Sequence, residues 1–169
     1  GWAGDDLFVV TANGRDRRRL YRVETAAGGV PHRLLQAMLD RAGWWSLERT
    51  IENGKWFLAL GDAGASSFEV SDFTIHEIDV RTLAVGPGTK LRGQLFDFYR
   101  TGSRLSPTGT YWLERRGESW CAVEIGSGRA AACGAEAEER RPLWARGDLL
   151  LRRRHDGAAT VLVAGTPGE

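Results

Sequence analysis

Two carboxylates in the middle of the chain are the first candidates for chemistry. Glu77 and Asp79 lie two residues apart in a segment with strand-like alternation, so both side chains lie on one face while His76 lies on the other. Paired carboxylates can act in acid–base catalysis or bind a divalent ion. The pattern is also typical of the solvated face of a half-buried strand, and we favour that interpretation. Asp97 and Tyr99 form a second candidate acid–base pair.

Sequence motifs for metal binding and cofactor binding are absent. His32, His76 and His155 are far apart and match no zinc-binding spacing. The segments 86–88 and 126–128 are rich in glycine but lack the spacing of a phosphate loop or a dinucleotide site. No nucleophile elbow is present either. The sequence therefore predicts no metal and no cofactor.

The two cysteines face each other in the expected arrangement of strands. If residues 126–128 form a three-residue hairpin loop, counting outward places Cys121 directly opposite Cys133. Directly opposed residues in an antiparallel pair are close enough for a disulfide. The alternative is a pair of free thiols in the core, which is the usual state of small buried cysteines in proteins of a reducing compartment, and we favour it.

Seven tryptophans are the most unusual feature of the composition. Tryptophan is enriched at interfaces and in pockets because it combines a large apolar surface with one hydrogen-bond donor. Trp44, Trp45, Trp112 and Trp120 lie in or beside expected strands and are our candidates for binding a ligand or a partner. The competing interpretation is that these side chains fill the core, and we favour it for most of them.

Charge argues against nucleic acid as a partner. The chain has 23 basic and 22 acidic residues, whereas phosphate neutralisation normally requires a basic excess. Two arginine clusters, at residues 15–19 and 152–154, lie near expected hairpin turns and are the remaining places for such contact. No apolar run approaches the roughly 18 residues of a membrane span.

The order of expected elements predicts a mainly β fold. Apolar alternation and turn residues predict about ten short strands, with hairpins between residues 7–10 and 20–23, 45–49 and 56–60, and 149–154 and 159–164. A meander is expected over residues 110–137, and the segment Gly86-Pro87-Gly88 is expected to separate two strands. Helical spacing of apolar residues predicts one amphipathic helix near residues 31–43.

Together these elements indicate an antiparallel β-barrel or a β-sandwich, with the helix beside or inside it. No repeat or linker divides the sequence, so residues 1–169 are expected to form a single domain.

The leading functional interpretation is a non-catalytic binding or interaction domain. A tryptophan-bearing face or cavity would hold a protein partner or an apolar small molecule. The first alternative is a small barrel enzyme of the isomerase or cyclase type, acting on an apolar molecule through one of the carboxylates named above. The second is nucleic-acid contact through the arginine-rich hairpin tips.

Overall fold

The computed structural model describes most of the chain. The described residues are 2–3, 6–13, 17–24, 30–66, 68–79, 81–82, 84–94, 98, 103–133, 142–156, 159–165 and 167. For residues 2–34, 36, 132 and 152–165 the description covers the backbone alone. Within these ranges the fold is mainly β, all sheets are antiparallel, and the single α-helix is one turn long.

The first sheet contains the expected N-terminal hairpin. Strands β1 (Trp2–Ala3), β2 (Asp6–Asn13), β3 (Arg17–Glu24) and β4 (Val30–Leu34) lie in sequence order. Pairing of Val10 with Leu20 confirms the predicted hairpin. Strand β4 was not expected, because residues 31–34 were assigned to the helix.

The predicted helix at residues 31–43 is mostly wrong. Helix α1 covers only Gln36–Leu39, because the backbone of β4 pairs with β3 and is therefore not available for helical hydrogen bonds. Between them Leu35 adopts a φ of 50°, which breaks the path from strand to helix. Two residues of the predicted apolar face, Leu35 and Leu39, nevertheless pack in the same apolar cluster.

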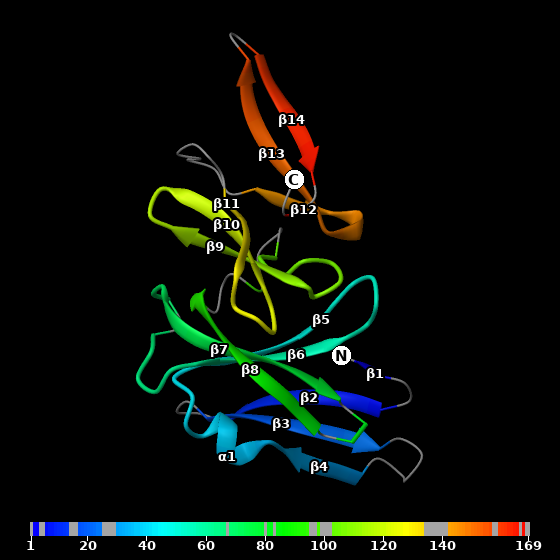
Figure 1. Ribbon diagram of the computed structural model, residues 1–169. Coiled ribbons are helices and arrows are strands. Elements are labelled where there is room, and N and C mark those ends of the chain that lie inside the picture. The colour runs from blue at the N-terminus through cyan, green and yellow to red at the C-terminus, as the bar shows by residue number, and fades with distance from the viewer. Residues whose placement is uncertain are drawn as a thin grey trace.

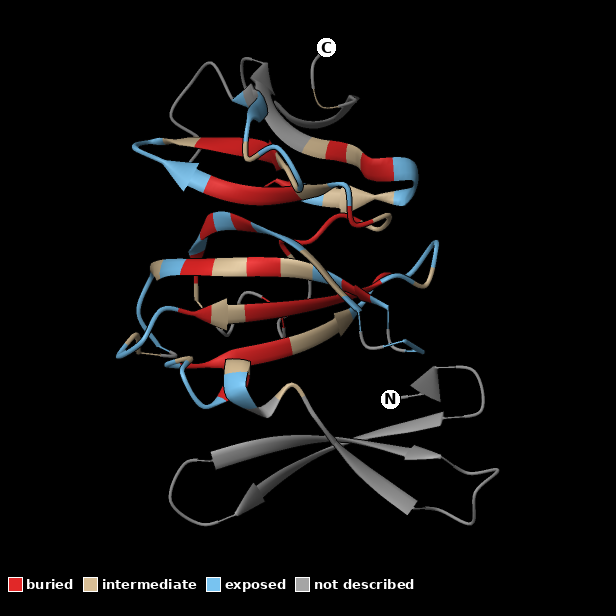
Figure 2. Cartoon of the chain, turned by 60° about the horizontal axis from the view of Figure 1, so that its bottom comes forward, coloured by how far each residue is buried: buried red, intermediate tan, exposed pale blue. Residues whose placement is uncertain are grey.

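The central sheet consists of β5 (Trp45–Arg49), β6 (Trp56–Gly61), β7 (Ser71–Asp79) and β8 (Ala84–Gly93), again in sequence order. The predicted hairpin of β5 and β6 is confirmed, and its turn contains Gly54 at a φ of 67°. Each face of this sheet carries a cluster of buried apolar residues, and buried residues lie along its strands in Figure 2. One face packs toward β9–β11, and α1 and the first sheet lie on the other side (Figure 1).

The segment Gly86-Pro87-Gly88 does not separate two strands, which corrects the sequence prediction. It lies inside β8, where His76 pairs with Gly88 but Ile78 pairs with Val85. Two residues of β8, Gly86 and Pro87, therefore oppose the single residue Glu77. Proline lacks a backbone donor, and a β-bulge is one of the few places in a sheet that accepts it.

Two three-stranded sheets complete the described fold. The predicted meander is confirmed as β9 (Tyr111–Arg116), β10 (Ser119–Glu124) and β11 (Ala130–Cys133). In the last sheet β12 (Leu143–Ala145) pairs with β13 (Leu149–Asp156), which pairs with β14 (Ala159–Gly165). The β13–β14 hairpin was expected, whereas β12 was not.

The described strands do not close into a barrel, so that alternative is wrong. They form four separate sheets, each with two edges. At the β8 edge, side chains of β9 take the place of a further strand. Trp112 Nε1 donates to the Arg92 carbonyl oxygen at 3.3 Å, and the Arg92 amide donates to Glu114 at 3.0 Å. These side chains satisfy both backbone groups of Arg92, so no further strand is needed to pair with them.

Alternation along the central strands produces two apolar layers. The layer on the β9–β11 side is built around an aromatic cluster of Trp44, Phe73, Phe98 and Trp112. The layer on the α1 side contains Trp45, Trp56, Leu58 and Ile78 from the sheet together with Leu39 from the helix. A third cluster joins β9 and β10 to Leu150 of β13.

Cys121 and Cys133 are opposed as predicted and are joined by a disulfide, with 4.0 Å between their Cα atoms. The structure thus differs from the free thiols that the compartment argument favoured. The loop and register that bring the two cysteines together also differ from the expected three-residue loop. The Glu124 amide bonds to the Arg129 carbonyl oxygen across a four-residue loop, and a bulge at Ala131 shifts the register by one.

Candidate functional site

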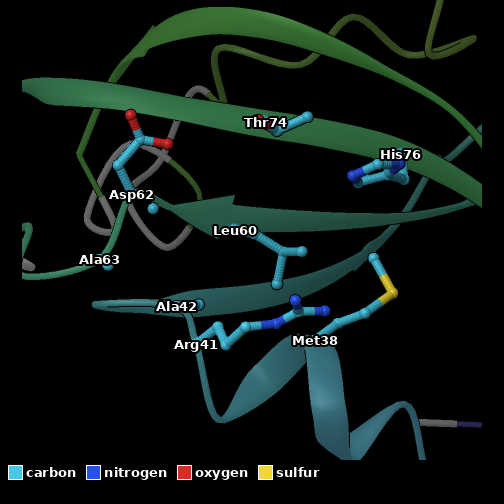
Figure 3. A pocket seen from close by; sticks show the side chains of 9 residues that line it. Met38, Arg41, Ala42, Leu60, Asp62, Ala63, Thr74 and His76 are labelled. Atoms are coloured by element: carbon cyan, nitrogen blue, oxygen red, sulfur yellow. The ribbon is translucent and has the colours of Figure 1, made fainter.

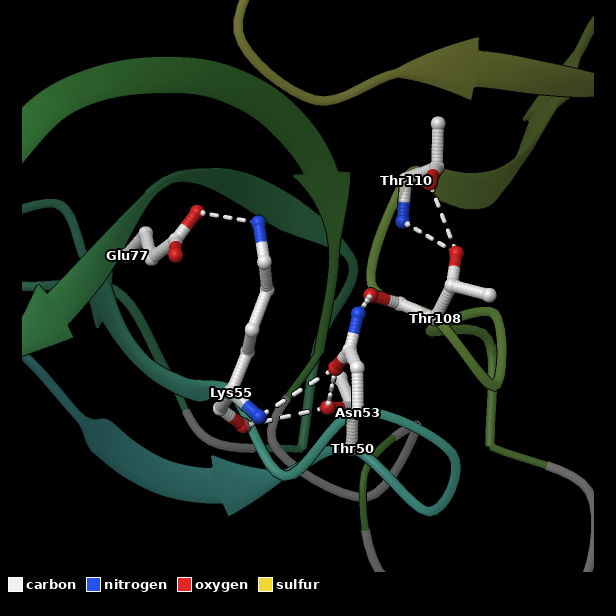
Figure 4. A network of polar contacts seen from close by, with 6 residues as sticks. All are labelled: Thr50, Asn53, Lys55, Glu77, Thr108 and Thr110. Atoms are coloured by element: carbon white, nitrogen blue, oxygen red, sulfur yellow. Dashed lines mark hydrogen bonds and ion pairs between the residues drawn. The ribbon is translucent and has the colours of Figure 1, made fainter.

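The predicted carboxylate pair on β7 makes structural contacts. Glu77 forms an ion pair with Lys55 at 3.0 Å, above a network in which Asn53 joins Thr50 to the Thr108 backbone (Figure 4). Asp79 accepts hydrogen bonds from the backbone amides of the turn that follows it, at 2.8 Å from Arg81 and 3.2 Å from Thr82.

Those amide hydrogen bonds, the Arg81 one foremost, hold the pKa of Asp79 below its ordinary value. The carboxylate is therefore stabilised in its charged form, which suits a turn cap better than a proton-transfer group. The other candidates, Asp97 and Tyr99, lie outside the described residues, as do the side chains of both arginine clusters.

The four candidate tryptophans do not share a face. Trp44 and Trp112 lie in the aromatic cluster, Trp45 lies on the opposite side of the central sheet, and Trp120 lies in the third cluster. All four are buried, with exposed fractions of 0–7%. Their positions correspond to the core-filling interpretation, and a ligand face made of these residues would need the core to open.

Buried carboxylates elsewhere in the described chain also have partners. Glu114 accepts from the Arg92 amide and from Arg116 Nε, and Asp148 accepts from both the backbone amide and the hydroxyl of Thr108.

Glu48 is half-buried and accepts a hydrogen bond from the Ser46 hydroxyl at 2.7 Å. Desolvation nevertheless raises the pKa of Glu48 above its ordinary value. Among the described residues no group of three or more His, Cys, Asp or Glu could hold a metal ion.

An open cavity of about 220 Å³ beside α1 gathers polar groups of a different kind. We call it the α1 pocket (Figure 3). Its floor comes from β6 and β7, its wall from α1 and the residues just after it, and its rim from the loop after β6. It is lined by Met38, Arg41, Ala42, Leu60, Gly61, Asp62, Ala63, Thr74 and His76.

The bulge in β8 positions His76 in this pocket. The Gly86 carbonyl oxygen lies 3.0 Å from His76 Nδ1. Because a carbonyl oxygen can only accept, Nδ1 carries the proton in this hydrogen bond. Gly88 provides the space for the ring, since a Cβ there would lie 2.6 Å from His76 Cε1 and 2.5 Å from Thr74 Cγ2.

Arg41 reaches the same pocket from the end of α1. Its Nε donates to the Ala37 carbonyl oxygen at 3.0 Å, which holds the exposed side chain along the helix. The guanidinium group points toward Met38 and Leu60 (Figure 3). Among the described residues no carboxylate forms an ion pair with it. The carboxylate of Asp62, which also lines the pocket, lies 3.9 Å from Lys90 Nζ.

Sequence reasoning missed this site. The alternation of β7 placed His76 opposite Glu77, which is the face the structure gives it, but nothing connected it to Arg41. One signal was available, because Gly-Pro-Gly inside an apolar alternation can mark a bulge rather than a boundary. The position of Arg41 could not be predicted, because the expected helix covered residues 31–43. In the structure α1 ends at Leu39, and Arg41 lines the pocket together with Leu60 of β6.

No protein-family model, curated protein or solved structure matches this chain. Over the described residues, no helix combines the length and the apolar character needed to cross a bilayer.

Proposed function

We propose that this chain is a non-catalytic binding domain that holds a small molecule in the α1 pocket. The observation that carries the proposal is the presence of two fixed polar groups with unused hydrogen-bonding capacity in one open cavity. His76 is fixed by Gly86 and Arg41 by Ala37, while Met38 and Leu60 supply apolar surface between them. A few placed polar groups on an apolar lining are the usual composition of a small-molecule site.

The size of the cavity supports a small ligand. A volume of about 220 Å³ is below the range of about 300–1,000 Å³ typical for drug-sized molecules. As part of the same proposal, residues 1–169 form one domain, and the two sheets that enclose the aromatic cluster form a sandwich.

A catalytic role has less support than binding. The Gly86 carbonyl oxygen orients His76, but no nucleophilic or carboxylate side chain among the described residues forms a hydrogen bond with its ring. Glu77 already forms an ion pair with Lys55, and Asp79 already accepts a hydrogen bond from a backbone amide of the turn that follows it.

A protein-binding face also has less support. The exposed large apolar side chains within the described chain are Ile51, Phe68, Val70 and Leu143, and they come from three separate segments. Single apolar side chains on a surface are normal and indicate no interface.

The test is ligand-observed saturation-transfer NMR with a mixed panel of small acids, amides, amines, alcohols and sugars. Ala63→Trp places a bulky side chain at the exposed rim of the pocket, and Ala84→Trp makes the same change at an exposed position of β8 outside it. We expect panel members that bind the wild type and Ala84→Trp but not Ala63→Trp. Absence of binding across the panel, equal binding to both variants, or turnover of a bound compound would each overturn the proposal.

A further inference from the structure

We infer that the α1 pocket selects a small carboxylate carrying a short apolar chain. This inference rests on the proposed function, because it names the ligand class of the same site. Three features of the pocket support it: the unpaired charge of Arg41, the donors that remain free, and the apolar surface beside them.

The unpaired charge of Arg41 favours an anion beside it. Arg41 has no ion-pair partner among the described residues, whereas the carboxylate of Asp62 has Lys90 at 3.9 Å and is directed away from Arg41 (Figure 3). The formal charges of the two charged lining residues, Arg41 and Asp62, sum to zero, so the preference for an anion is local to the Arg41 guanidinium group. An anionic group placed beside Arg41 is attracted to it, and a cationic group is repelled.

The remaining donors match a carboxylate. Nε of Arg41 is occupied by the Ala37 carbonyl oxygen, which leaves its two terminal nitrogens for a ligand. A guanidinium group binds a carboxylate through two parallel hydrogen bonds, and these charge-assisted bonds are the strong ones. Thr74 also lines the pocket, and its hydroxyl has no hydrogen-bond partner within the described part of the chain.

Apolar side chains next to the guanidinium group account for the short chain of the ligand. Met38 comes from α1, Leu60 from β6 and Ala42 from the segment after the helix, and all three are half-buried. Alkyl carbons that cover them lose contact with water, which contributes roughly 0.8 kcal/mol for each buried CH₂. A polar anion without such a chain gains only the contact with Arg41.

Three probes of equal length separate charge from shape: butyrate, butyramide and butylamine. Each is titrated into the purified chain, and the backbone amide shifts of Gly61, Ala42 and Thr74 report binding. We expect butyrate to bind at least about fivefold more tightly than butyramide, and butylamine more weakly than both. Added salt should weaken butyrate binding and leave butyramide binding unchanged, because screening acts on charges.

The matched variants are Arg41→Gln and Arg115→Gln, which remove one exposed arginine inside and outside the pocket respectively. We expect butyrate affinity to fall about tenfold in Arg41→Gln, which is about 1.4 kcal/mol, and to stay unchanged in Arg115→Gln. Arg41→Lys keeps the charge but not the paired donors, so its affinity for butyrate should lie between those of Arg41→Gln and Arg115→Gln.

The outcomes separate this inference from the proposed function. If butyramide binds as tightly as butyrate, or if Arg41→Gln has no effect, the carboxylate class is wrong while the pocket remains a binding site. If the mixed panel gives pocket ligands but butyrate does not bind, the class is again wrong. If neither butyrate nor any panel member binds, both proposals fail.

Discussion

At the scale of single residues, the absence of a side chain at Gly88 determines where His76 lies. Gly88→Ala is expected to lower the free energy of unfolding by about 1–3 kcal/mol, the usual cost of overpacking. Its Cβ would meet Thr74 Cγ2 at 2.5 Å and His76 Cε1 at 2.6 Å, so the ring must leave the Gly86 carbonyl. Denaturant unfolding measures the first effect, and the ¹⁵N shifts of the His76 ring measure the second.

The double variant Thr74→Ser, Gly88→Ala provides the control. Serine keeps the hydroxyl of Thr74 but removes Cγ2, which is one of the two atoms in the way. Part of the lost stability should return. Wild-type stability and unchanged His76 signals in the single variant would contradict the placement of this ring.

Glu48 illustrates a charge that costs stability. Burial raises its pKa in the folded chain, whereas the unfolded chain keeps the ordinary value. Between those two pKa values the folded state binds more protons, so the contribution of Glu48 to the free energy of unfolding falls as pH rises through that window and stays reduced above it. Glu48→Gln removes this penalty and leaves an oxygen for the Ser46 hydroxyl.

We therefore expect Glu48→Gln to melt higher than the wild type at neutral pH, on the order of 1–3 °C for a chain of this length. The difference should vanish at acid pH, below the ordinary glutamate pKa. Calorimetric melting curves across the pH range measure it. Glu118→Gln, on the exposed turn after β9, is the control and should show no such pH-dependent gain. A destabilised Glu48→Gln at neutral pH would show that the charge itself is needed.

At the scale of elements, sequence patterns predicted most strand pairs but not their irregularities. The hairpins β2–β3, β5–β6 and β13–β14 follow from apolar alternation around turn residues, which are local properties. The strand conformation of residues 30–34 does not follow from local properties, because pairing with β3 outweighs a helical apolar pattern there. The bulge at Gly86 has the same origin, since it depends on the neighbouring strand, and the α1 pocket depends on both.

The β10–β11 hairpin should depend on its disulfide for stability. Its disulfide closes a loop with a sequence separation of 12 residues, so the loss of loop entropy in the unfolded chain is worth about 3 kcal/mol. The double variant Cys121→Ala, Cys133→Ser should lose stability of about that size in denaturant unfolding. Cys133 is exposed, so serine there adds no buried polar group.

Mass spectrometry of the denatured wild-type chain after alkylation, without reductant, supplies the independent check. A disulfide leaves no thiol to alkylate. Two alkylated cysteines together with an unchanged free energy of unfolding in the double variant would mean that the hairpin holds free thiols, as the compartment argument favoured.

At the scale of the whole molecule, apolar alternation and turn residues indicated a mainly β fold but not the arrangement of its sheets. A barrel and a set of separate sheets need the same alternating strands, and they differ only in what lies at each edge. Here the β8 edge meets Trp112 and Glu114 side chains instead of a strand. The tryptophan count was misleading for a related reason, because a central sheet that is buried on both faces needs large side chains in two layers.

The aromatic cluster connects the central sheet to β9–β11. Phe73 is fully buried, with its ring centre 5.4 Å from that of Trp44, 5.9 Å from Phe98 and 5.1 Å from Trp112. Phe73→Ala should therefore cost about 3–5 kcal/mol, the usual range for removing a buried phenylalanine.

If the cluster joins the two sheets into one cooperative unit, the Phe73→Ala variant should still unfold in a single transition with a lower midpoint. Tryptophan fluorescence and far-UV circular dichroism should then give the same midpoint. Ile51→Ala is the matched control, because that side chain is 90% exposed and its loss should change stability by less than about 0.5 kcal/mol. Two separated transitions in the Phe73 variant would instead mean that each sheet keeps its own stability. The second apolar layer, around Trp45 and Leu58, would then hold the central sheet to α1 without help from β9–β11.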